Sequence, residues 1–290
     1  MMLSTQTAGL AHRLGDAEAI RTLARVGYDA YDYSMFTNPS QEGHPLNGDD
    51  SLAYARELRQ VADQAGIPCN QAHAPFPSYI AGNDAYNAAI SPLIDRAVAF
   101  AAVLGAKSIV VHPIAVPDPD RQLALNLDLY HRLQPLCEQL GIKVALENMW
   151  GHDVTGTRIV PNVCSTGESF ADYLDRLDSR YFTACLDLGH CGLVGEDAAA
   201  MIRQLGHDRL QALHVHDNNG LEDTHTAPFM SQMDFGSITK ALADIQYSGE
   251  MTLESDNFLK GFPDDFLETA ARFMHDIGRQ LIRMVEQAGR

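Results

Sequence analysis

Cysteine is scarce in this chain and forms no recognisable pattern. Among 290 residues there are 5 cysteines, which are scattered, odd in number and without a Cys-x-x-Cys pair. This argues against a disulfide framework or a thiolate zinc site, and it is typical of proteins from a reducing compartment. The cysteines are Cys69, Cys137, Cys164, Cys185 and Cys191.

Long apolar runs are also missing, and we expect no targeting segment. We find no apolar run of the roughly 18 residues that a membrane span requires. The beginning of the chain, MMLSTQTAGLAHRLG, has no basic flank followed by an apolar stretch, so we expect no signal peptide. The sequence therefore predicts a cytoplasmic protein that has no membrane partner.

Basic residues are few compared with acidic ones. The chain has 21 Lys and Arg against 38 Asp and Glu, which gives a formal net charge of −17. Such a charge repels polyanions over long range, so nucleic-acid binding would require a local basic patch. The ranges 34–50 and 214–235 contain neither Lys nor Arg. We therefore expect no nucleic-acid partner.

What the sequence does contain is a repeated unit of an apolar run, a polar loop and a helical pattern. Eight such units in about 250 to 300 residues predict an α/β fold, a (β/α)8 TIM barrel forming one domain over 1–290. A doubly wound sheet is the alternative, but QTAGLAHRLG lacks the G-x-G-x-x-G turn typical of it. The eight runs are MLSTQTA, YDAYDYS, IPCNQAH, SIVVHP, IKVALEN, FTACLDLGH, LQALHVHD and EMTLESD.

Three helical segments can be delimited from their periodicity. One begins at Ser51, which we interpret as its N-cap, and ends at Gly66. A second extends from Asp84 to Gly105. The last has an apolar stripe that we expect to be buried, made of Phe266, Ala270, Phe273, Ile277, Leu281 and Met284.

Six of the eight runs end in a residue that can bind a metal or move a proton. In a parallel barrel all carboxyl ends of the strands lie on one face, where the loops build the active site. Residues far apart in the sequence are therefore expected to converge. A single histidine after a strand, such as His112, is more often structural. Six such residues, each at the end of a different strand, favour a shared functional site. They are His73, His112, Glu147, Asp187, His214 and Glu254.

Glu147 and Glu254 carry most weight, because a carboxylate at a buried strand end needs a partner. A divalent cation shared with Asp187 and His214 would satisfy all of them. Three oxygen ligands and one imidazole suit Mn²⁺, Mg²⁺ or Co²⁺ and do not exclude Zn²⁺.

The loops after two of these strands hold further candidates. His190 is expected to be a ligand or a substrate contact. Asp223 and His225 are expected to hold a second metal or to close over the substrate as a lid. His216 and Asp217 carry less weight, since we expect His216 to face away from the ligands.

The motifs ALEN, CLDLGH, LHVHDNNG…DTH and TLES resemble those of the xylose-isomerase-like barrels. This superfamily includes sugar phosphate isomerases and epimerases, ketose 3-epimerases and endonuclease IV, and the resemblance covers essentially the whole chain. By resemblance to the ketose epimerases, Glu147, Asp187, His214 and Glu254 would hold one Mn²⁺ or Co²⁺. His190 would contact the substrate.

Endonuclease IV has the same set and additional zinc ligands, whose positions look matched by His73, His112, His190, Asp223 and His225. The chain departs from the pattern of each of these two families at one point. The epimerases usually carry an arginine a few residues after the metal histidine, where this chain has NNG. Endonuclease IV grips DNA with basic loops, whereas the loops here contribute little beyond Arg13, Arg121, Arg158 and Lys260.

The resulting hypothesis is a metal-dependent isomerase or epimerase acting on a neutral keto-sugar or related polyol. Glu147 and Glu254 would be the catalytic acid and base acting through an enediolate. A lyase or dehydratase with the same carbanion chemistry, including C-glycoside β-elimination, an endonuclease IV-like hydrolase, and a non-catalytic metal-binding protein remain alternatives. The protein is a candidate homo-oligomer. Expected substrate contacts or apolar walls are His190, His73, His112, Trp150, Phe36, Phe76 and Tyr79.

Overall fold

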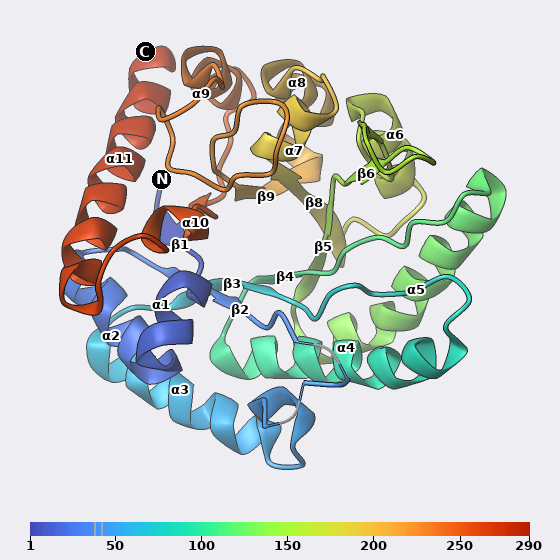
Figure 1. Ribbon diagram of the computed structural model, residues 1–290, viewed down its shortest axis with the longest axis horizontal. Helices are drawn as coiled ribbons and strands as arrows, with labels where there is room; N and C mark the ends of the chain where they lie inside the picture. Colours follow the sequence, from blue (N-terminus) through green and yellow to red (C-terminus); the bar gives the residue numbers. More distant parts are fainter. Residues whose placement is uncertain (38, 42) are drawn as a thin grey trace.

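The computed structural model describes residues 1–290 except 38 and 42, and it shows a ring of parallel strands surrounded by helices (Figure 1). This confirms the predicted α/β barrel. The eight strands of the ring are β1 (Leu3–Thr5), β2 (Tyr31–Ser34), β3 (Cys69–His73), β4 (Ser108–Val110), β5 (Lys143–Glu147), β8 (Phe182–Asp187), β9 (Leu210–His214) and β10 (Met251–Leu253).

The ring closes through two short seams. Six strands pair in the order β2-β3-β4-β5-β8-β9, and β1 pairs with β10. Single parallel bridges, Gln6 to Asp32 and Val215 to Leu253, join these two sheets on either side. Closure satisfies the backbone groups that an open sheet edge would leave unpaired.

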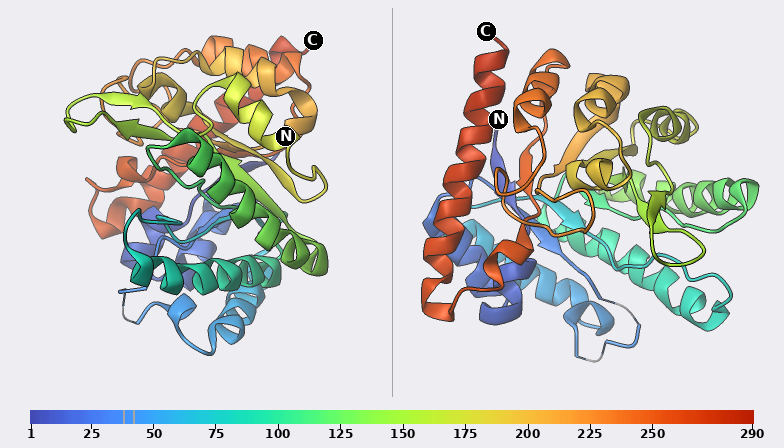
Figure 2. Two further views of the ribbon diagram at one scale, coloured as in Figure 1. Left: turned by 90° about the vertical axis from the view of Figure 1, so that its right-hand side faces the viewer. Right: turned by 45° about the horizontal axis from the view of Figure 1, so that its top comes forward.

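Helices cover the outside of the ring, as the two views of Figure 2 show. A small antiparallel hairpin, β6 (Trp150–His152) with β7 (Ile159–Pro161), projects from the loop after β5. The helices are α1 (Ala8–Leu14), α2 (Asp16–Val26), α3 (Ser51–Ala65), α4 (Asp84–Leu104), α5 (Pro119–Leu140), α6 (Gly167–Asp175), α7 (Leu188–Leu193), α8 (Ala198–Arg209), α9 (Phe235–Asp244), α10 (Asp256–Leu259) and α11 (Leu267–Ala288), with 3-10 turns at Pro45–Asn47 and Asp264–Phe266.

Helix α4 departs from the expectation about apolar runs. By length and composition it could cross a membrane, with a mean hydropathy of 1.4 over its most apolar window. In the fold it packs against α3 and α5 and covers β3 and β4. The apolar side chains of one face are buried in the core between helix and barrel, as is usual for a helix of this architecture. The buried side chains include Ile90, Leu93, Ile94, Val98, Phe100 and Leu104.

The helix limits predicted from the sequence agree in part with the structure. Gly66 ends α3 in the left-handed conformation, as expected, but α3 already begins at Ser51 and Asp50 is its N-cap. The stripe predicted for α11 is wrong at Phe266 and Phe273, which are 45% and 54% exposed. The buried stripe is shifted by one position, to Leu267, Ala270, Ala271, Met274, Gly278, Leu281, Ile282 and Val285.

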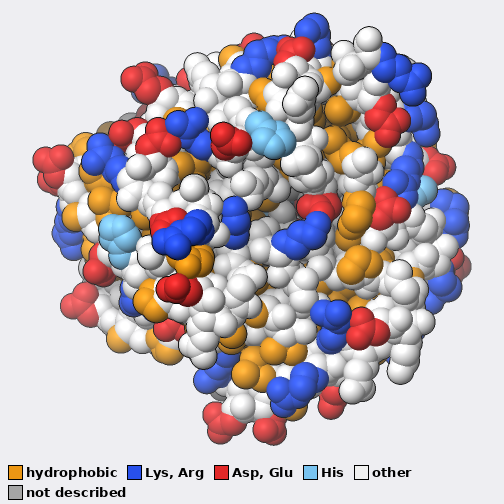
Figure 3. Space-filling model, turned by 180° about the vertical axis from the view of Figure 1, so that it is seen from behind, with side chains coloured by type: hydrophobic (Ala, Val, Ile, Leu, Met, Phe, Trp, Pro, Cys, Tyr) orange, Lys and Arg blue, Asp and Glu red, His pale blue; other side chains and the backbone are white. Residues whose placement is uncertain are grey.

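The two ends of the barrel differ in chemistry. All six predicted strand-end residues lie at the carboxyl ends. The opposite face, shown in Figure 3, has a hollow near its middle with Lys and Arg side chains around it. A cavity of about 820 Å³ lies at the amino ends of the strands, lined by Lys107, Lys143 and Arg180. Although it is large, it lies at the far end of the barrel from every candidate site residue.

Candidate metal centre

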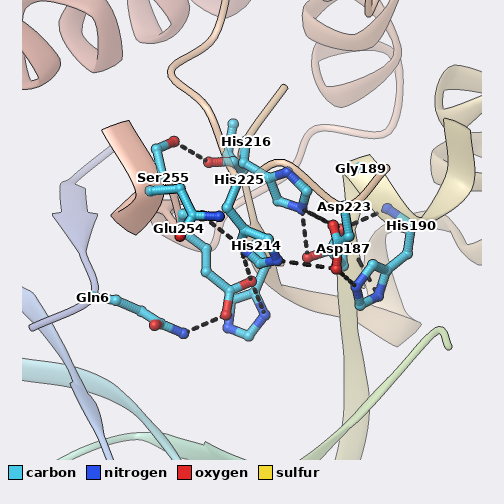
Figure 4. A network of polar contacts seen from close by, with 12 residues as sticks. Gln6, Asp187, Gly189, His190, His214, His216, Asp223, His225, Glu254 and Ser255 are labelled. Carbon is cyan, nitrogen blue, oxygen red and sulfur yellow. Dashed lines mark hydrogen bonds and ion pairs between the residues drawn. The ribbon is translucent and has the colours of Figure 1, made fainter. Parts of the chain in front are cut away.

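Four side chains from four strands form what we call the central group: Glu147, Asp187, His214 and Glu254. Glu147, Asp187 and His214 are the last residues of β5, β8 and β9, and Glu254 follows β10. One ligand atom from each lies within 4.8 Å of those of the other three, and all four residues are buried. Figure 4 shows Asp187, His214 and Glu254 turned toward one another. The structure thus brings together the set expected from the sequence.

The ring of His214 is oriented by its neighbours. Its Nδ1 faces both glutamates, at 3.2 Å from Glu147 Oε1 and 3.0 Å from Glu254 Oε2. Its Nε2 lies 3.0 Å from the Gln71 amide nitrogen, which donates to Asp32 Oδ2 at 2.9 Å. Because Nε2 is engaged by Gln71, Nδ1 is the ring nitrogen that remains to serve as a metal ligand.

Two carboxylate oxygens of the central group accept no hydrogen bond within the described residues. Glu147 Oε2 and Glu254 Oε2 are buried and unpartnered, although imidazole nitrogens approach within 2.6 and 3.0 Å. Burial favours protonation of Glu147, but His112 and His214 outweigh it and hold its pKa well below the usual range. An ionised, buried and unsatisfied oxygen is costly unless a cation completes it. The donor set therefore fits a divalent ion.

His73 and His112 form a second group with Glu147, which we call the β3–β4 group. The two Nε2 atoms lie 2.8 Å apart, and His112 Nε2 lies 2.6 Å from Glu147 Oε2. Burial lowers the pKa of His112 against the opposing effect of Glu147. Because Glu147 belongs to both groups, its two oxygens can serve neighbouring ligand positions.

A third group, the loop group, consists of His190, His216, Asp223 and His225. Asp223 Oδ2 lies 3.3 Å from His190 Nε2 and 3.2 Å from His225 Nε2. The rings of His216 and His225 stack with centroids 4.0 Å apart. Two histidines and a carboxylate that point at one place are donors that transition metals accept.

Three of the histidines are anchored in the same way. The Nδ1 of His73, His190 and His225 each lies 2.8–2.9 Å from a main-chain carbonyl oxygen. Donation from Nδ1–H to a carbonyl fixes the ring orientation and directs Nε2 into the site. Metal-binding histidines commonly have this arrangement.

Carboxylates raise the pKa of two histidines of the loop group, His190 and His225. Burial disfavours the charge on His190, yet Asp187 and Asp223 raise its pKa to about 10. His225 is likewise raised to a pKa of about 10, against burial, mainly by Asp223 and Glu254. In the metal-free protein these imidazolium ions neutralise the nearby carboxylates near neutral pH.

His216 corrects an expectation. Its Nε2 lies 3.0 Å from Asp187 Oδ1, so the ring faces the site and not away from it. His216 and His214 are two residues apart, and side chains with that spacing share a side of an extended chain. This spacing was the signal available in the sequence. The next residue, Asp217, accepts hydrogen bonds from the amides of Ser231 and Met233 and so supports the loop after β9.

Several neutral or distant side chains of the site had no distinctive sequence signal. Gln6 Nε2 donates to Glu254 Oε1 at 2.6 Å, as Figure 4 shows. Asn148 bridges the ends of β5 and β8 by accepting from the Asp187 amide and donating to its carbonyl. Together with Asp32 and Gln71, these residues hold the ligand side chains in place.

The aromatic residues expected near the substrate lie around these groups. Phe36 and Phe76 are 43% and 45% exposed, and their rings lie 4.3 and 4.6 Å from those of His73 and His112. The Trp150 indole donates to Asp223 Oδ2 at 3.2 Å. The Tyr79 hydroxyl accepts a hydrogen bond from Arg121 at 3.5 Å.

Comparison with known proteins adds the family context. A family model described as xylose isomerase-like TIM barrel matches residues 20–277. Similar sequences include uncharacterized protein y4fM of Sinorhizobium fredii, 24% identical over 250 residues that span 75% of each chain. Uncharacterized protein MJ1311 of Methanocaldococcus jannaschii is 27% identical over 248 residues, covering 82% of this chain and 78% of the relative.

Solved structures share the fold over almost the full length. A D-tagatose 3-epimerase-like protein has a TM-score of 0.76 at 22% identity and covers 99% of each chain. D-psicose 3-epimerase has a TM-score of 0.72 at 17% identity, covering 97% of this chain and 99% of that one. The 3-keto-D-glucoside 4-epimerase YcjR of E. coli has a TM-score of 0.71 at 17% identity, covering 95% and 99%.

Proposed function

The chain belongs to the xylose isomerase-like TIM barrel family, and from this premise we propose that it is a divalent-metal-dependent isomerase or epimerase of a keto-sugar or related polyol. The observation that carries the proposal is the central group, in which two buried glutamates flank His214 Nδ1 and each keeps an unpartnered oxygen. The similar solved structures named as sugar 3- and 4-epimerases support the same class of reaction.

In this proposal the ion is held by Glu147, Asp187, His214 and Glu254, with Mn²⁺ as the first candidate. When bound, it would supply Lewis acidity that stabilises negative charge on the substrate oxygens. The donors are three carboxylates and one imidazole, a set that suits Mn²⁺, Mg²⁺ or Co²⁺ and also accepts Zn²⁺.

The protein's own groups would move the proton. Glu147 and Glu254 come from β5 and the end of β10, and we assign them to remove and return the proton on the carbon beside the carbonyl. Gln6 holds one oxygen of Glu254 by a 2.6 Å hydrogen bond and thereby sets the direction of the other. Two bases acting on opposite faces of the carbon give epimerisation, and one base relaying between adjacent carbons gives isomerisation. If a leaving group lies β to the carbanion, the same bases support elimination.

Proton–deuterium exchange in D₂O tests the proposal, because exchange reports carbanion formation whichever product follows. We expect the metal-loaded protein to exchange the α-proton of a ketose in a panel of ketohexoses and ketopentoses. Glu147→Gln and Glu254→Gln should each slow exchange by about 10²-fold or more. Glu250→Gln is the matched control, since Glu250 lies at the other end of the barrel and pairs with Lys107 at 2.6 Å. Wild-type exchange in both active-site variants would refute the assignment of the bases.

One observation favours a second candidate, an endonuclease IV-like phosphodiester hydrolase. The β3–β4 and loop groups contain the five residues that the resemblance to endonuclease IV matches to additional zinc ligands, namely His73, His112, His190, Asp223 and His225. Incubation with abasic-site duplex DNA decides between the two. Strand nicking that requires metal would support the hydrolase, whereas intact DNA together with exchange on a ketose supports the isomerase or epimerase.

A further inference from the structure

A pocket of about 630 Å³ opens beside the central group, with Glu254 and His225 in its wall. This volume lies within the range of small-molecule sites, which are about 300–1,000 Å³. Apart from Phe36, the other lining residues come from two segments, 6–13 and 256–260, and include Gln6, Arg13 and Lys260. The pocket therefore provides space for the part of a substrate that extends away from the ligand atoms.

Gln6 gives this pocket a fixed polar wall. Its side chain is 2% exposed, and its Nε2 donates to Glu254 Oε1 at 2.6 Å. Its Oε1 is buried and accepts no hydrogen bond from the described residues. A buried acceptor without a donor is costly, and a substrate hydroxyl in the pocket would satisfy it.

Two cations line the same pocket although they are far apart in the sequence. Arg13 is held in place by a 2.6 Å hydrogen bond to the Phe262 carbonyl and an ion pair with Asp264. Lys260 differs, because in residues 1–290 other than 38 and 42 no carboxylate lies within ion-pairing distance of its ammonium group. Asp256 also lines the pocket but pairs with neither cation. An unneutralised lysine is notable in a chain with a net charge of −17.

We propose that the pocket selects a keto-sugar carrying an anionic group, a carboxylate or a phosphate, at the end remote from the reacting carbon, with Lys260 as the residue that binds it. The sugar part of this inference rests on the proposed function. Gln6 would accept from a hydroxyl between the two ends, and Arg13 would add fixed positive charge. A lysine contributes a point charge that suits either anion.

This inference revises the neutral substrate expected from the sequence. That expectation rested on the small number of cationic residues in each loop taken separately. In the fold, Arg13 from the start of the chain and Lys260 from near its end line a single pocket. Two cations suffice for one acidic group but not for a nucleic-acid backbone, which needs several phosphate contacts.

The test compares three sugars that differ only at carbon 6: D-fructose, its carboxylate D-fructuronate and D-fructose 6-phosphate. Binding to the metal-loaded protein is measured by calorimetry. We expect at least one acid to bind about tenfold more tightly than fructose, the size of one charge-assisted hydrogen bond. The preferred acid identifies the anion as carboxylate or phosphate. The preference should weaken at high salt, because the lysine is exposed to solvent.

Variants distinguish a specific contribution of Lys260 to binding from a general effect of the protein's net charge. Lys260→Met should abolish the preference and leave fructose binding within about twofold, while Lys260→Arg should retain it. Lys240→Met is the matched control, since Lys240 is on α9 and pairs with Asp244. Equal affinity for the three sugars, no detectable affinity for any of them, or a preference that survives Lys260→Met would overturn the inference.

The same variants distinguish this inference from the proposed function. If Lys260→Met abolishes acid preference but no sugar exchanges its proton in D₂O, the anion pocket stands and the proposed reaction fails. If a ketose exchanges and Lys260→Met changes no affinity, the reaction stands and the anion pocket fails.

Discussion

His73, at the end of β3, and His112, just after the neighbouring β4, have their Nε2 atoms 2.8 Å apart. His112 Nε2 is also 2.6 Å from Glu147 Oε2, so three potential donors of one group converge. Buried nitrogens and oxygens this close are stabilised either by a shared proton or by a shared cation. The arrangement leads directly to a prediction about metal content.

We predict that His112→Ala lowers the bound metal by about one ion per chain and leaves the central group occupied. Glu147→Ala should have a larger effect, because Glu147 belongs to both groups. Elemental analysis of protein saturated with Mn²⁺ or Zn²⁺ and then freed of excess ion measures the stoichiometry. His131→Ala, in α5 and remote from the groups, is the control. Equal metal content in His112→Ala and the wild type would show that the β3–β4 group binds no ion.

Metal binding to the loop group should release protons and weaken as the pH falls. The pKa of His190 and of His225 is raised to about 10 in the metal-free protein, so both are protonated at neutral pH. A metal ligand must give up its proton, and apparent affinity therefore rises with pH up to that range. Titration with Zn²⁺ in weakly buffered solution should release more protons from the wild type than from His225→Ala. Equal release from the two proteins would contradict the involvement of His225.

Gly189 in α7 should be intolerant of a side chain. A Cβ at this position would overlap the His216 ring, whose Nε2 lies 3.0 Å from Asp187 Oδ1. Gly189→Ala must displace that ring, and we expect a loss of about 1–3 kcal/mol of stability together with weaker metal binding. Gly192→Ala is a matched control in the same helix, because its Cβ would find the nearest atom at an ordinary 3.5 Å. Thermal unfolding and metal titration of both variants measure the difference.

Asp29 connects the start of the chain with its last helix. It accepts from the Leu3 amide at 2.8 Å and from two nitrogens of Arg279 at 2.7 and 2.8 Å. Arg279 is the main cause that holds the pKa of Asp29 below its usual value. We predict that Asp29→Asn costs about 1 kcal/mol at pH 7, since the pair is partly exposed and screened.

The pH dependence of that cost has a definite sign. A carboxylate whose pKa is lowered by folding stabilises the protein above its unfolded pKa of about 3.9, and this contribution is lost as the pH falls through the folded value. The stability difference between wild type and Asp29→Asn should therefore be constant above about pH 5 and shrink in more acidic solution. Urea unfolding at several pH values measures it, with Asp276→Asn as the exposed control. A difference that persists unchanged into acid would exclude the ion pair as its source.

The sequence predicted the strands and the convergence of their last residues, because parallel strands in a closed ring leave few positions for a strand-end side chain. The stripe of α11 was misplaced because Phe266 and Phe273 are large and apolar, although the barrel accepts the smaller Ala271 and Gly278 at the contact. At Gly278 a Cβ would overlap Leu3. How closely a residue can approach the barrel, and not its hydrophobicity alone, therefore determines which face of α11 is buried.

The supporting residues could not be predicted for a different reason. Gln6 and Gln71 are neutral amides, and their role depends on partners that are distant in the sequence. The pairing of Arg13 with the segment near Lys260 also depends on how the ring closes. Local patterns carry no information about such contacts, because they arise only when the two ends of the chain meet.

The seams of the ring have a consequence for biosynthesis. The bridge from Gln6 to Asp32 and the bridge from Val215 to Leu253 lie beside the ligands, and the Gln6–Glu254 hydrogen bond spans 248 positions. The chain must therefore have left the ribosome as far as Glu254 before this side chain can join Glu147, Asp187 and His214. A chain that ends before β10 would hold Glu147, Asp187 and His214 without Glu254, so under the proposed function the cation would bind only after β10 has joined the ring.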